Sequence, residues 1–271
     1  MQKICIIIPC YNEQFRLPRD EFLEVFQSTN FFFCFVNDGS SDKTQYVLEM
    51  LRSGREERVQ VISLPRNKGK AEAVRTGVLK ALSWHDFSYI GYFDADFSTP
   101  ITEALHLLEE SGEDKLLIMG SRVKRLGATI ERNLARHYFG RIFSTVASLT
   151  LKIPVYDTQC GAKLISTKVA RQLFTAPFLT RWLFDMEILA RCIEMFGRKE
   201  TCTTVSEIPL KVWKRKDHSH LKISHMLKVP FELYKIYSHY KLESSGKTNL
   251  VPILASDSCM GAPGIKDQPQ H

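Results

Sequence analysis

The amino-acid sequence predicts an α/β fold with a doubly wound, mostly parallel central sheet. Short β-branched runs alternate with helical stretches along the first half of the chain, which is the rhythm of such a sheet. These runs lack apolar–polar alternation, as expected for parallel strands covered on both faces. Several of them end in Asn, Asp or Glu, and ligands of open α/β sheets bind at the carboxyl ends of the strands.

The expected elements follow one another in a regular order. Strands are predicted at residues 3–8 (a run that stops at Pro9), 31–36, 59–64, 89–93 and 116–119, and helices at 43–51 and 71–82. Residues 207–213 are expected to form an edge strand, because they contain Pro209. A turn rich in Gly, Ser and Asp precedes the first helix, where Ser41 or Asp42 can cap it. The strand ends at residues 9–13, 37–41 and 94–96 are expected to meet at one edge of the sheet.

Asp94 and Asp96 follow the apolar run 89–93 directly and are separated only by Ala95. Two carboxylates at this spacing can face one hard cation, and Mg²⁺ commonly takes one or two carboxylates together with substrate phosphates. Alternatively, the pair is a solvated turn at the end of a strand. The loop 66–70 places two Lys and one Arg around Gly69 before a helix, so it either contacts a phosphate or forms a basic surface turn.

Four segments, in this order, resemble family 2 glycosyltransferases of the GT-A fold: residues 8–13, 36–42, 67–71 and 94–96. Three later segments are similar to polyprenyl-phosphate sugar transferases, especially the dolichyl-phosphate glucosyltransferases: residues 119–122, 156–164 and 181–189. The resemblance covers roughly residues 3–215. It implies a GT-A (Rossmann-like) fold with a mostly parallel sheet, to which the sequence adds amphipathic helices towards the C-terminus.

The resemblance also implies roles for individual residues on the donor side. The nucleotide base and ribose would be contacted by Pro9, Tyr11, Glu13 and Asp38, and Lys70 would approach the nucleotide. Asp94 and Asp96, with Ala95 between them, would hold Mg²⁺ or Mn²⁺ against the diphosphate of a nucleotide sugar. The implied activity is inverting transfer of a hexose from that donor, with UDP-glucose favoured over GDP-mannose.

Candidate acceptor residues lie in the second half of the chain. Arg122 follows a predicted strand, and Arg suits bidentate recognition of phosphate. Asp157 is the main candidate for organising the acceptor, with Asp185 and Glu187 as alternatives. If the acceptor is a hydroxyl, one carboxylate must act as general base; a polyprenyl or dolichyl phosphate is already anionic and needs no strong base. A soluble glycan or another hydroxyl acceptor is the alternative.

The charge balance of 37 Lys and Arg against 30 Asp and Glu gives a net charge of +7, which favours an anionic partner. A nucleic-acid-binding module is the non-enzymatic alternative, but the cations do not form an open stripe with stacking aromatic residues, so no nucleic-acid partner is expected. Residues 134–153 and 221–240 are amphipathic and basic; such helices either lie in a membrane interface or pack on the domain. No stretch is apolar enough to span a bilayer.

The seven cysteines are scattered without a Cys-x-x-Cys pair, so neither a disulfide framework nor a zinc site is expected. A cytoplasmic protein, peripheral at the cytoplasmic face of a membrane, is the simplest interpretation. Three regions are predicted: a catalytic domain at residues 1–215, a basic amphipathic helical region at 216–242, and a disordered tail at 243–271.

Overall fold

The central sheet of the protein has seven strands in the order β3-β2-β1-β4-β7-β5-β8. The computed structural model describes residues 2–131, 134–214, 228–240 and 242. The strands are β1 (Ile4–Cys10), β2 (Phe32–Asn37), β3 (Val59–Ser63), β4 (Tyr89–Phe93), β5 (Leu117–Ser121), β7 (Ala162–Ser166) and β8 (Val205–Pro209). Neighbouring strands are parallel except that β7 runs antiparallel to β4 and β5. The predicted mostly parallel α/β sheet is confirmed.

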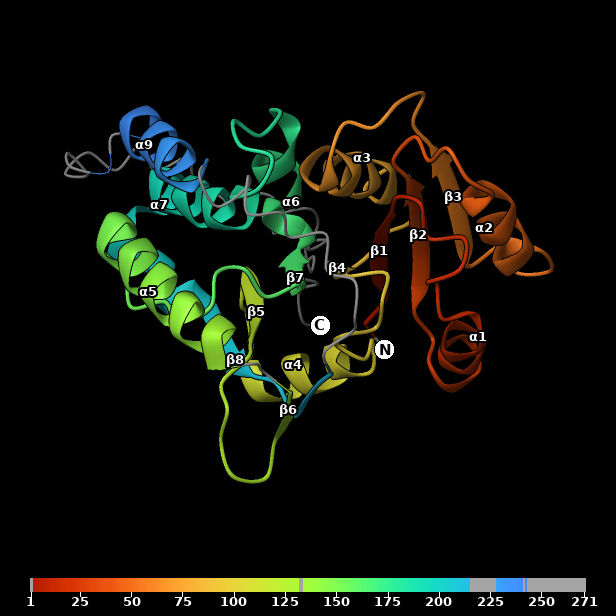
Figure 1. Ribbon diagram of the computed structural model, residues 1–271, viewed down its shortest axis with the longest axis horizontal. Coiled ribbons are helices and arrows are strands. Elements are labelled where there is room, and N and C mark those ends of the chain that lie inside the picture. The colour runs from red at the N-terminus through yellow and green to blue at the C-terminus, as the bar shows by residue number, and fades with distance from the viewer. Residues whose placement is uncertain (1, 132–133, 215–227, 241, 243–271) are drawn as a thin grey trace, which may run out of the picture.

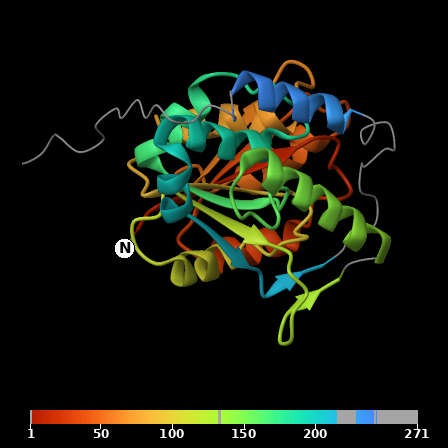
Figure 2. The ribbon, with the colours of Figure 1, turned by 90° about the vertical axis from the view of Figure 1, so that its left-hand side faces the viewer.

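Helices cover both faces of the sheet, as Figures 1 and 2 show. One face carries α1 (Arg19–Ser28), α2 (Thr44–Arg52) and α4 (Glu103–Ser111), and the other carries α3 (Lys70–Ala81), α6 (Thr167–Thr175) and α7 (Phe184–Thr204). Two more helices, α5 (Leu134–Leu151) and α9 (Val229–His239), pack against each other, and α5 also contacts α7. Successive side chains of a strand pack into the cores on opposite faces of the sheet, as Ile6 and Ile7 of β1 do.

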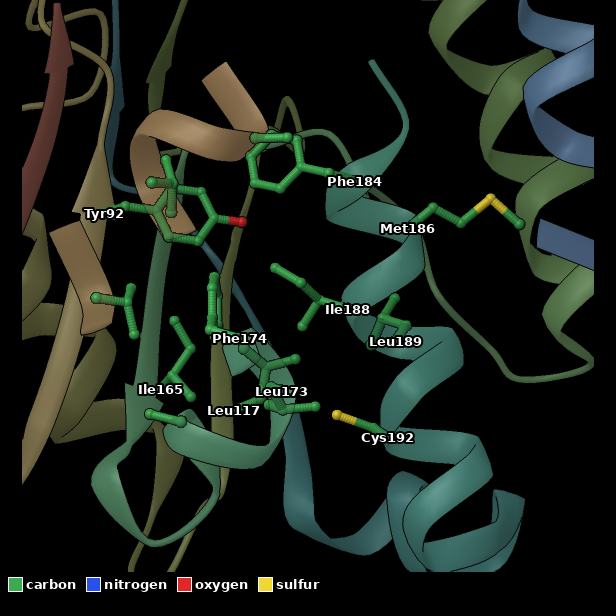
Figure 3. Close-up of a cluster of buried hydrophobic side chains, with 14 of the residues drawn as sticks. Tyr92, Leu117, Ile165, Leu173, Phe174, Phe184, Met186, Ile188, Leu189 and Cys192 are labelled. Carbon is green, nitrogen blue, oxygen red and sulfur yellow. The ribbon is translucent and has the colours of Figure 1, made fainter. Parts of the chain in front are cut away.

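The core beneath α6 and α7 is densely aromatic and aliphatic (Figure 3). Tyr92 of β4 and Phe184 at the start of α7 lie with their ring centroids 5.7 Å apart. Along α7, Ile188 and Cys192 point into the same cluster as Phe174 of α6. This packing places the first turn of α7 directly against the end of β4, where the sequence predicts the functional edge.

The expected helices at residues 43–51 and 71–82 are confirmed as α2 and α3. The N-cap position of α2 is Lys43 rather than Ser41 or Asp42; Asp42 lies one residue before it, and its Oδ1 accepts the N–H of Thr44, the first residue of the helix, at 2.9 Å. Three helices that the periodicity did not single out, namely α1, α4 and α6, complete the layers.

The prediction of one edge strand at residues 207–213 is wrong, because this segment contributes to two strands. β8 ends at Pro209, which has no N–H to extend a ladder. The chain then turns at Leu210, whose N–H is donated to the Ser121 carbonyl at 2.9 Å. Val212–Trp213 form a separate strand, β9, which pairs in parallel with β6 (Thr129–Ile130) in a small second sheet.

Of the helix expected at residues 221–240, α9 is the part that the structure describes; residues 215–227 and the expected tail at 243–271 lie outside the described residues. The division at residue 215 therefore stays a prediction. Among the described helices, none combines the length and apolar character needed to cross a bilayer.

Candidate active site

The carboxyl ends of β1, β2 and β4 meet at one edge of the sheet, because β1 pairs in parallel with both of its neighbours. Pro9 is the penultimate residue of β1, and Tyr11 and Glu13 lie just after the strand. Tyr11 is exposed, whereas Glu13 is buried. The convergence of the three strand ends that the sequence predicts is confirmed.

Asp38 connects two of the segments that the sequence singles out. Its carboxylate accepts the backbone N–H groups of Lys68 at 2.7 Å and Gly69 at 2.8 Å. Burial raises the pKa of Asp38, although these two hydrogen bonds oppose the shift. The turn after β2 is therefore tied to the basic loop that precedes α3. A Cβ at Gly39, where φ is +64°, would lie 2.3 Å from the Arg66 backbone, so these two turns are in direct contact.

Asp94 and Asp96 lie at the end of β4, on either side of the buried Ala95. The Oδ1 atom of Asp94 lies 2.6 Å from Lys70 Nζ, and Asp96 Oδ1 accepts the Ser98 N–H at 2.9 Å. Behind Asp94 stands Gly161: a Cβ there would come within 2.0 Å of Asp94 Oδ2. The absence of a side chain at residue 161 is what lets the carboxylate occupy this position.

The two carboxylates suit a hard divalent cation that completes its shell with substrate oxygens. Within the described ranges, no group of three or more His, Cys, Asp or Glu side chains could hold a metal ion alone. Mg²⁺ is usually held by one or two carboxylates plus phosphate oxygens and waters, so an all-protein cage is not required. Asp94 and Asp96 therefore fit a cation that binds together with a diphosphate.

Glu13 lies beside this acidic edge, and its buried Oε2 accepts no hydrogen bond, although Arg16 Nε forms an ion pair with it at 3.4 Å. Burial raises its pKa from 4.5 to about 7, against the opposing effect of Arg16, and Asp96, Asp42 and Asp94 add to the rise. The folded protein therefore favours the protonated acid, and the contribution of Glu13 to the free energy of unfolding falls as pH increases from 4.5 to about 7.

Glu13→Gln is expected to remove this pH-dependent cost. At about 1.4 kcal/mol per pKa unit, the free energy of unfolding of the variant should gain up to about 3 kcal/mol on the wild type between pH 4.5 and pH 8. Urea unfolding across this range, in the presence of EDTA, measures the difference. A difference that does not change with pH would contradict the assignment.

Arg122 and Asp157 form a bidentate ion pair. Nε and Nη2 of Arg122 each lie 2.7 Å from one oxygen of Asp157, and the Arg122 N–H is also donated to Asp157. Glu207 of β8, which the sequence analysis passed over, accepts the N–H groups of Tyr156 at 2.7 Å and Asp157 at 2.6 Å. Trp213 of β9 stacks near the guanidinium, 5.6 Å from its centre. The acceptor loop is thus anchored by the half-buried carboxylate of Glu207.

Asp185 is paired within the core. Its Oδ1 atom lies 2.6 Å from Lys163 Nζ and 2.5 Å from the Tyr92 hydroxyl that donates to it. Lys163 is fully buried and donates two further hydrogen bonds, to the carbonyls of Thr158 and Cys160. A lysine inside the apolar run of β7 was the available signal for this network, because buried lysines require partners.

A second group that sequence reasoning missed lies over the basic loop. Arg181 donates to Asn67 Oδ1 at 3.0 Å, and a Cβ at Gly69 would lie 2.9 Å from its guanidinium. The loop that carries Arg181 is held from α9, because Glu232 Oε2 accepts the N–H groups of Trp182 and Leu183. Such contacts between residues 49 to 114 positions apart leave no local sequence signal.

The structure therefore brings the donor-side candidates together at one edge and seats the acceptor-side loop beside them, because Gly161, four residues after Asp157, touches Asp94. Arg122 and Asp157 face this edge as a pair, and Asp185 supports it from beneath through Tyr92. The catalytic roles of these three residues stay predictions. Glu187, the remaining alternative, lies in the core among five donor groups and away from solvent.

Known proteins are similar to this chain over most of its length. A dolichyl-phosphate beta-glucosyltransferase of Trichomonas vaginalis is 30% identical over 248 residues, covering 86% of this chain and 72% of that protein. The dolichyl-phosphate beta-glucosyltransferase of Drosophila melanogaster is 33% identical over 204 residues, covering 69% of this chain and 61% of that protein.

Among solved structures, glucosyl-3-phosphoglycerate synthase from Mycobacterium tuberculosis, in complex with Mn²⁺, uridine diphosphate and phosphoglyceric acid, superposes with a TM-score of 0.60. It is 15% identical, with 90% of this chain and 81% of that chain covered, which supports the GT-A fold alone. The model of the family described as "Glycosyl transferase family 2" matches residues 5–174. With that match over more than half of its length, and with the strand-end acidic pair in place, the chain belongs to glycosyl transferase family 2.

Proposed function

We propose that this protein transfers a glucosyl group from UDP-glucose to a polyprenyl or dolichyl phosphate. The observation that carries the proposal is the similarity to dolichyl-phosphate beta-glucosyltransferases, which extends over 86% of the chain and so includes the acceptor-side segments as well as the donor edge. A similarity confined to the donor half would support only a nucleotide-sugar enzyme.

On the donor side, Asp94 and Asp96 would hold Mg²⁺ or Mn²⁺ against the diphosphate, with Asp38 and the loop it anchors beside the nucleotide. The bound cation would stabilise the negative charge that develops on the departing diphosphate. Tyr11 is exposed at the same edge and offers a ring face to the base. Glu13 stands next to it and would contact the ribose.

On the acceptor side, the pairing of Asp157 and Asp185 agrees with an anionic acceptor. Each carboxylate already faces a cation, Asp157 through Arg122 and Asp185 through Lys163. A phosphate monoester has its second pKa near 6 and is largely dianionic at neutral pH, so it needs no base. The Arg122 guanidinium keeps donor capacity beyond its own two bonds to Asp157 and would orient the phosphate.

In the transfer step, an oxygen of the lipid phosphate forms a bond to the anomeric carbon of glucose. The bond between that carbon and the β-phosphate oxygen of the donor breaks, and its electron pair leaves with UDP. Attack on the face opposite the leaving group inverts the anomeric configuration. No proton changes hands when the acceptor is dianionic.

A membrane surface would be met by α5 and α9, which pack against each other. Ile142, Val146 and Leu149 lie on one stripe of α5 and are 62%, 39% and 71% exposed, opposite the buried Ala147 and Leu151. On α9, Phe231 and Tyr234 are 61% and 66% exposed, and the Lys235 ammonium lies over the Phe231 ring. Exposed apolar and aromatic residues with neighbouring lysines are typical of interfacial helices. This arrangement supports a protein that is peripheral at a membrane surface, and the cytoplasmic face stays a prediction from the sequence.

The double variant Ile142→Ser/Leu149→Ser is expected to bind vesicles of anionic phospholipid about tenfold more weakly, because two apolar contacts with the interface are lost. Vesicle co-sedimentation measures the change. Tyr46→Ser, which alters an exposed apolar residue of α2 on the other face of the sheet, is the matched control. Equal binding by the double variant and the control would contradict a membrane role for α5.

Gly161→Ala is expected to impair the donor edge. The added methyl group would lie 2.0 Å from Asp94 Oδ2, so the carboxylate must move. We expect at least about a tenfold loss in the affinity for UDP with Mn²⁺, since a displaced ligand weakens metal binding to that extent. Isothermal titration with UDP and Mn²⁺ tests this, and an unchanged dissociation constant would show that Asp94 is not needed there.

The proposal is tested by incubating the protein with UDP-glucose or GDP-mannose, with Mn²⁺ or EDTA, and with a short-chain polyprenyl phosphate in detergent. We expect a glucosylated lipid phosphate from UDP-glucose with Mn²⁺ and almost none with EDTA. Transfer of mannose would show that GDP-mannose, and not UDP-glucose, is the donor. Transfer that EDTA does not affect would show that no metal ion is required.

A further inference from the structure

Lys70 occupies a position from which it can compete with a metal ion. Its ammonium lies 2.6 Å from Asp94 Oδ1, and the two side chains are 35% and 41% exposed, so solutes can reach the pair. The same nitrogen lies 5.9 Å and 5.8 Å from the ring centroids of Tyr92 and Phe184. The ammonium therefore rests between a carboxylate and an aromatic floor.

This floor is fixed from beneath. The Tyr92 hydroxyl donates to Asp185, and the buried Lys163 ammonium lies on the same carboxylate oxygen. The other oxygen of Asp94 is backed by Gly161. The rings of Tyr92 and Phe184 and the backbone at Gly161 are held in place. The flexible side chain of Lys70 is therefore the part of this group that can move, and it can move towards solvent.

We propose that Lys70 is a built-in counter-ion of Asp94 that opposes binding of a divalent cation alone and moves to the donor diphosphate when cation and nucleotide bind together. The inference rests on the proposed metal site at Asp94 and Asp96. A cation on Asp94 Oδ1 cannot share that oxygen with an ammonium at 2.6 Å without strong repulsion between the two positive charges. A diphosphate supplies new acceptors for the ammonium and removes this conflict.

The arrangement makes metal and nucleotide binding interdependent. Together, Asp94, Asp96 and Lys70 carry a net charge of −1. Without the lysine, the two carboxylates carry −2 and attract a cation more strongly. Since the coupling between two ligands is reciprocal, UDP should raise Mn²⁺ affinity by the same factor as Mn²⁺ raises UDP affinity. Removing Lys70 should shrink that factor.

The test measures Mn²⁺ binding by the electron paramagnetic resonance signal of free Mn²⁺, with and without UDP. Lys70→Met is expected to bind Mn²⁺ alone about tenfold more tightly than the wild type, and to lose most of the enhancement by UDP. Lys70→Arg, which keeps the charge, should bind Mn²⁺ alone as weakly as the wild type. Lys80→Met removes the same charge from an exposed position near the end of α3 and should change nothing.

Mn²⁺ affinity of Lys70→Met equal to or below that of the wild type would overturn the proposal, because a purely structural ion pair gives no gain on removal. Asp96→Asn separates this failure from failure of the metal site. If Asp96→Asn weakens Mn²⁺ binding while Lys70→Met does not strengthen it, Lys70 alone is misassigned. If Asp96→Asn leaves Mn²⁺ binding unchanged, the metal site and the counter-ion role both fall.

Discussion

Asp96→Ala is expected to lower the rate of glucosyl transfer about a thousandfold. The variant removes one of two carboxylates that face the proposed cation, and the loss of preorganised charge at a leaving group costs about 10²–10³ in rate for a single group. The fold should survive, since the Asp96 carboxylate accepts a hydrogen bond from the Ser98 N–H within its own turn. Glucosyl transfer under saturating UDP-glucose measures the effect.

Asp86→Ala is the matched control for this variant. Asp86 is exposed in the loop that leads into β4, at the opposite end of the strand from Asp96. It should retain wild-type activity, and both variants should unfold within a few degrees of the wild type. If Asp96→Ala keeps more than about a tenth of the wild-type rate, the cation is held elsewhere or is not required.

Glu187→Ala is expected to destabilise the protein by about 3–5 kcal/mol, as is usual when one partner of a buried ion pair is removed. The carboxylate has no exposed surface and accepts hydrogen bonds from the backbone N–H groups of Leu179 and Thr180 and from the Tyr240 hydroxyl. Arg191 lies 3.0 Å away on the next turn of α7. Chemical denaturation measures the loss.

The comparison that isolates this buried network is Glu194→Ala, an exposed carboxylate on the same helix. Its effect should stay within about 0.5 kcal/mol, as for most surface substitutions. Glu187→Gln should fall between the two, because the amide keeps one acceptor oxygen. A Glu187→Ala protein as stable as Glu194→Ala would mean that the loop 179–183 is not held by this carboxylate.

The sheet was largely predictable because its strands are buried on both faces and therefore appear as unbroken apolar runs. Ile4–Cys10 and Tyr89–Phe93 are of this kind, and the polar residues after them mark the functional edge. Strand direction is not encoded in such a run. Ala162–Ser166 is as buried as its neighbours, yet it lies antiparallel between β4 and β5, and nothing in its composition indicates this.

The donor edge was more predictable than the acceptor side for a physical reason. Asp38, Asp94 and Asp96 stand at strand ends, so local sequence alone brings them to the edge. The groups that hold the acceptor loop act over long separations: Glu207 binds Asp157 from 50 positions away. From the sequence, the half-buried Glu207 and the buried Lys163 cannot be told from solvated charges, because only the tertiary structure supplies their partners.

Asp185 illustrates the same limit. A carboxylate in the first turn of a helix is typically a cap or an exposed group, and the resemblance made it a candidate for the acceptor. The structure instead places its Oδ1 atom between Lys163 and Tyr92, two residues that face each other across the β4–β7 ladder. Asp185 would then affect catalysis indirectly, by holding the Tyr92 ring on which the Lys70 ammonium lies.

The acceptor proposed for this protein is a lipid phosphate. The most direct measurement compares glucosyl transfer from UDP-glucose to three acceptors of equal concentration: a short polyprenyl phosphate, the matching polyprenol, and 3-phosphoglycerate. We predict a glucosylated product from polyprenyl phosphate alone, with UDP released in equal amount. Efficient transfer to the polyprenol would require a base and contradict the anionic acceptor, and transfer to 3-phosphoglycerate would contradict the lipid.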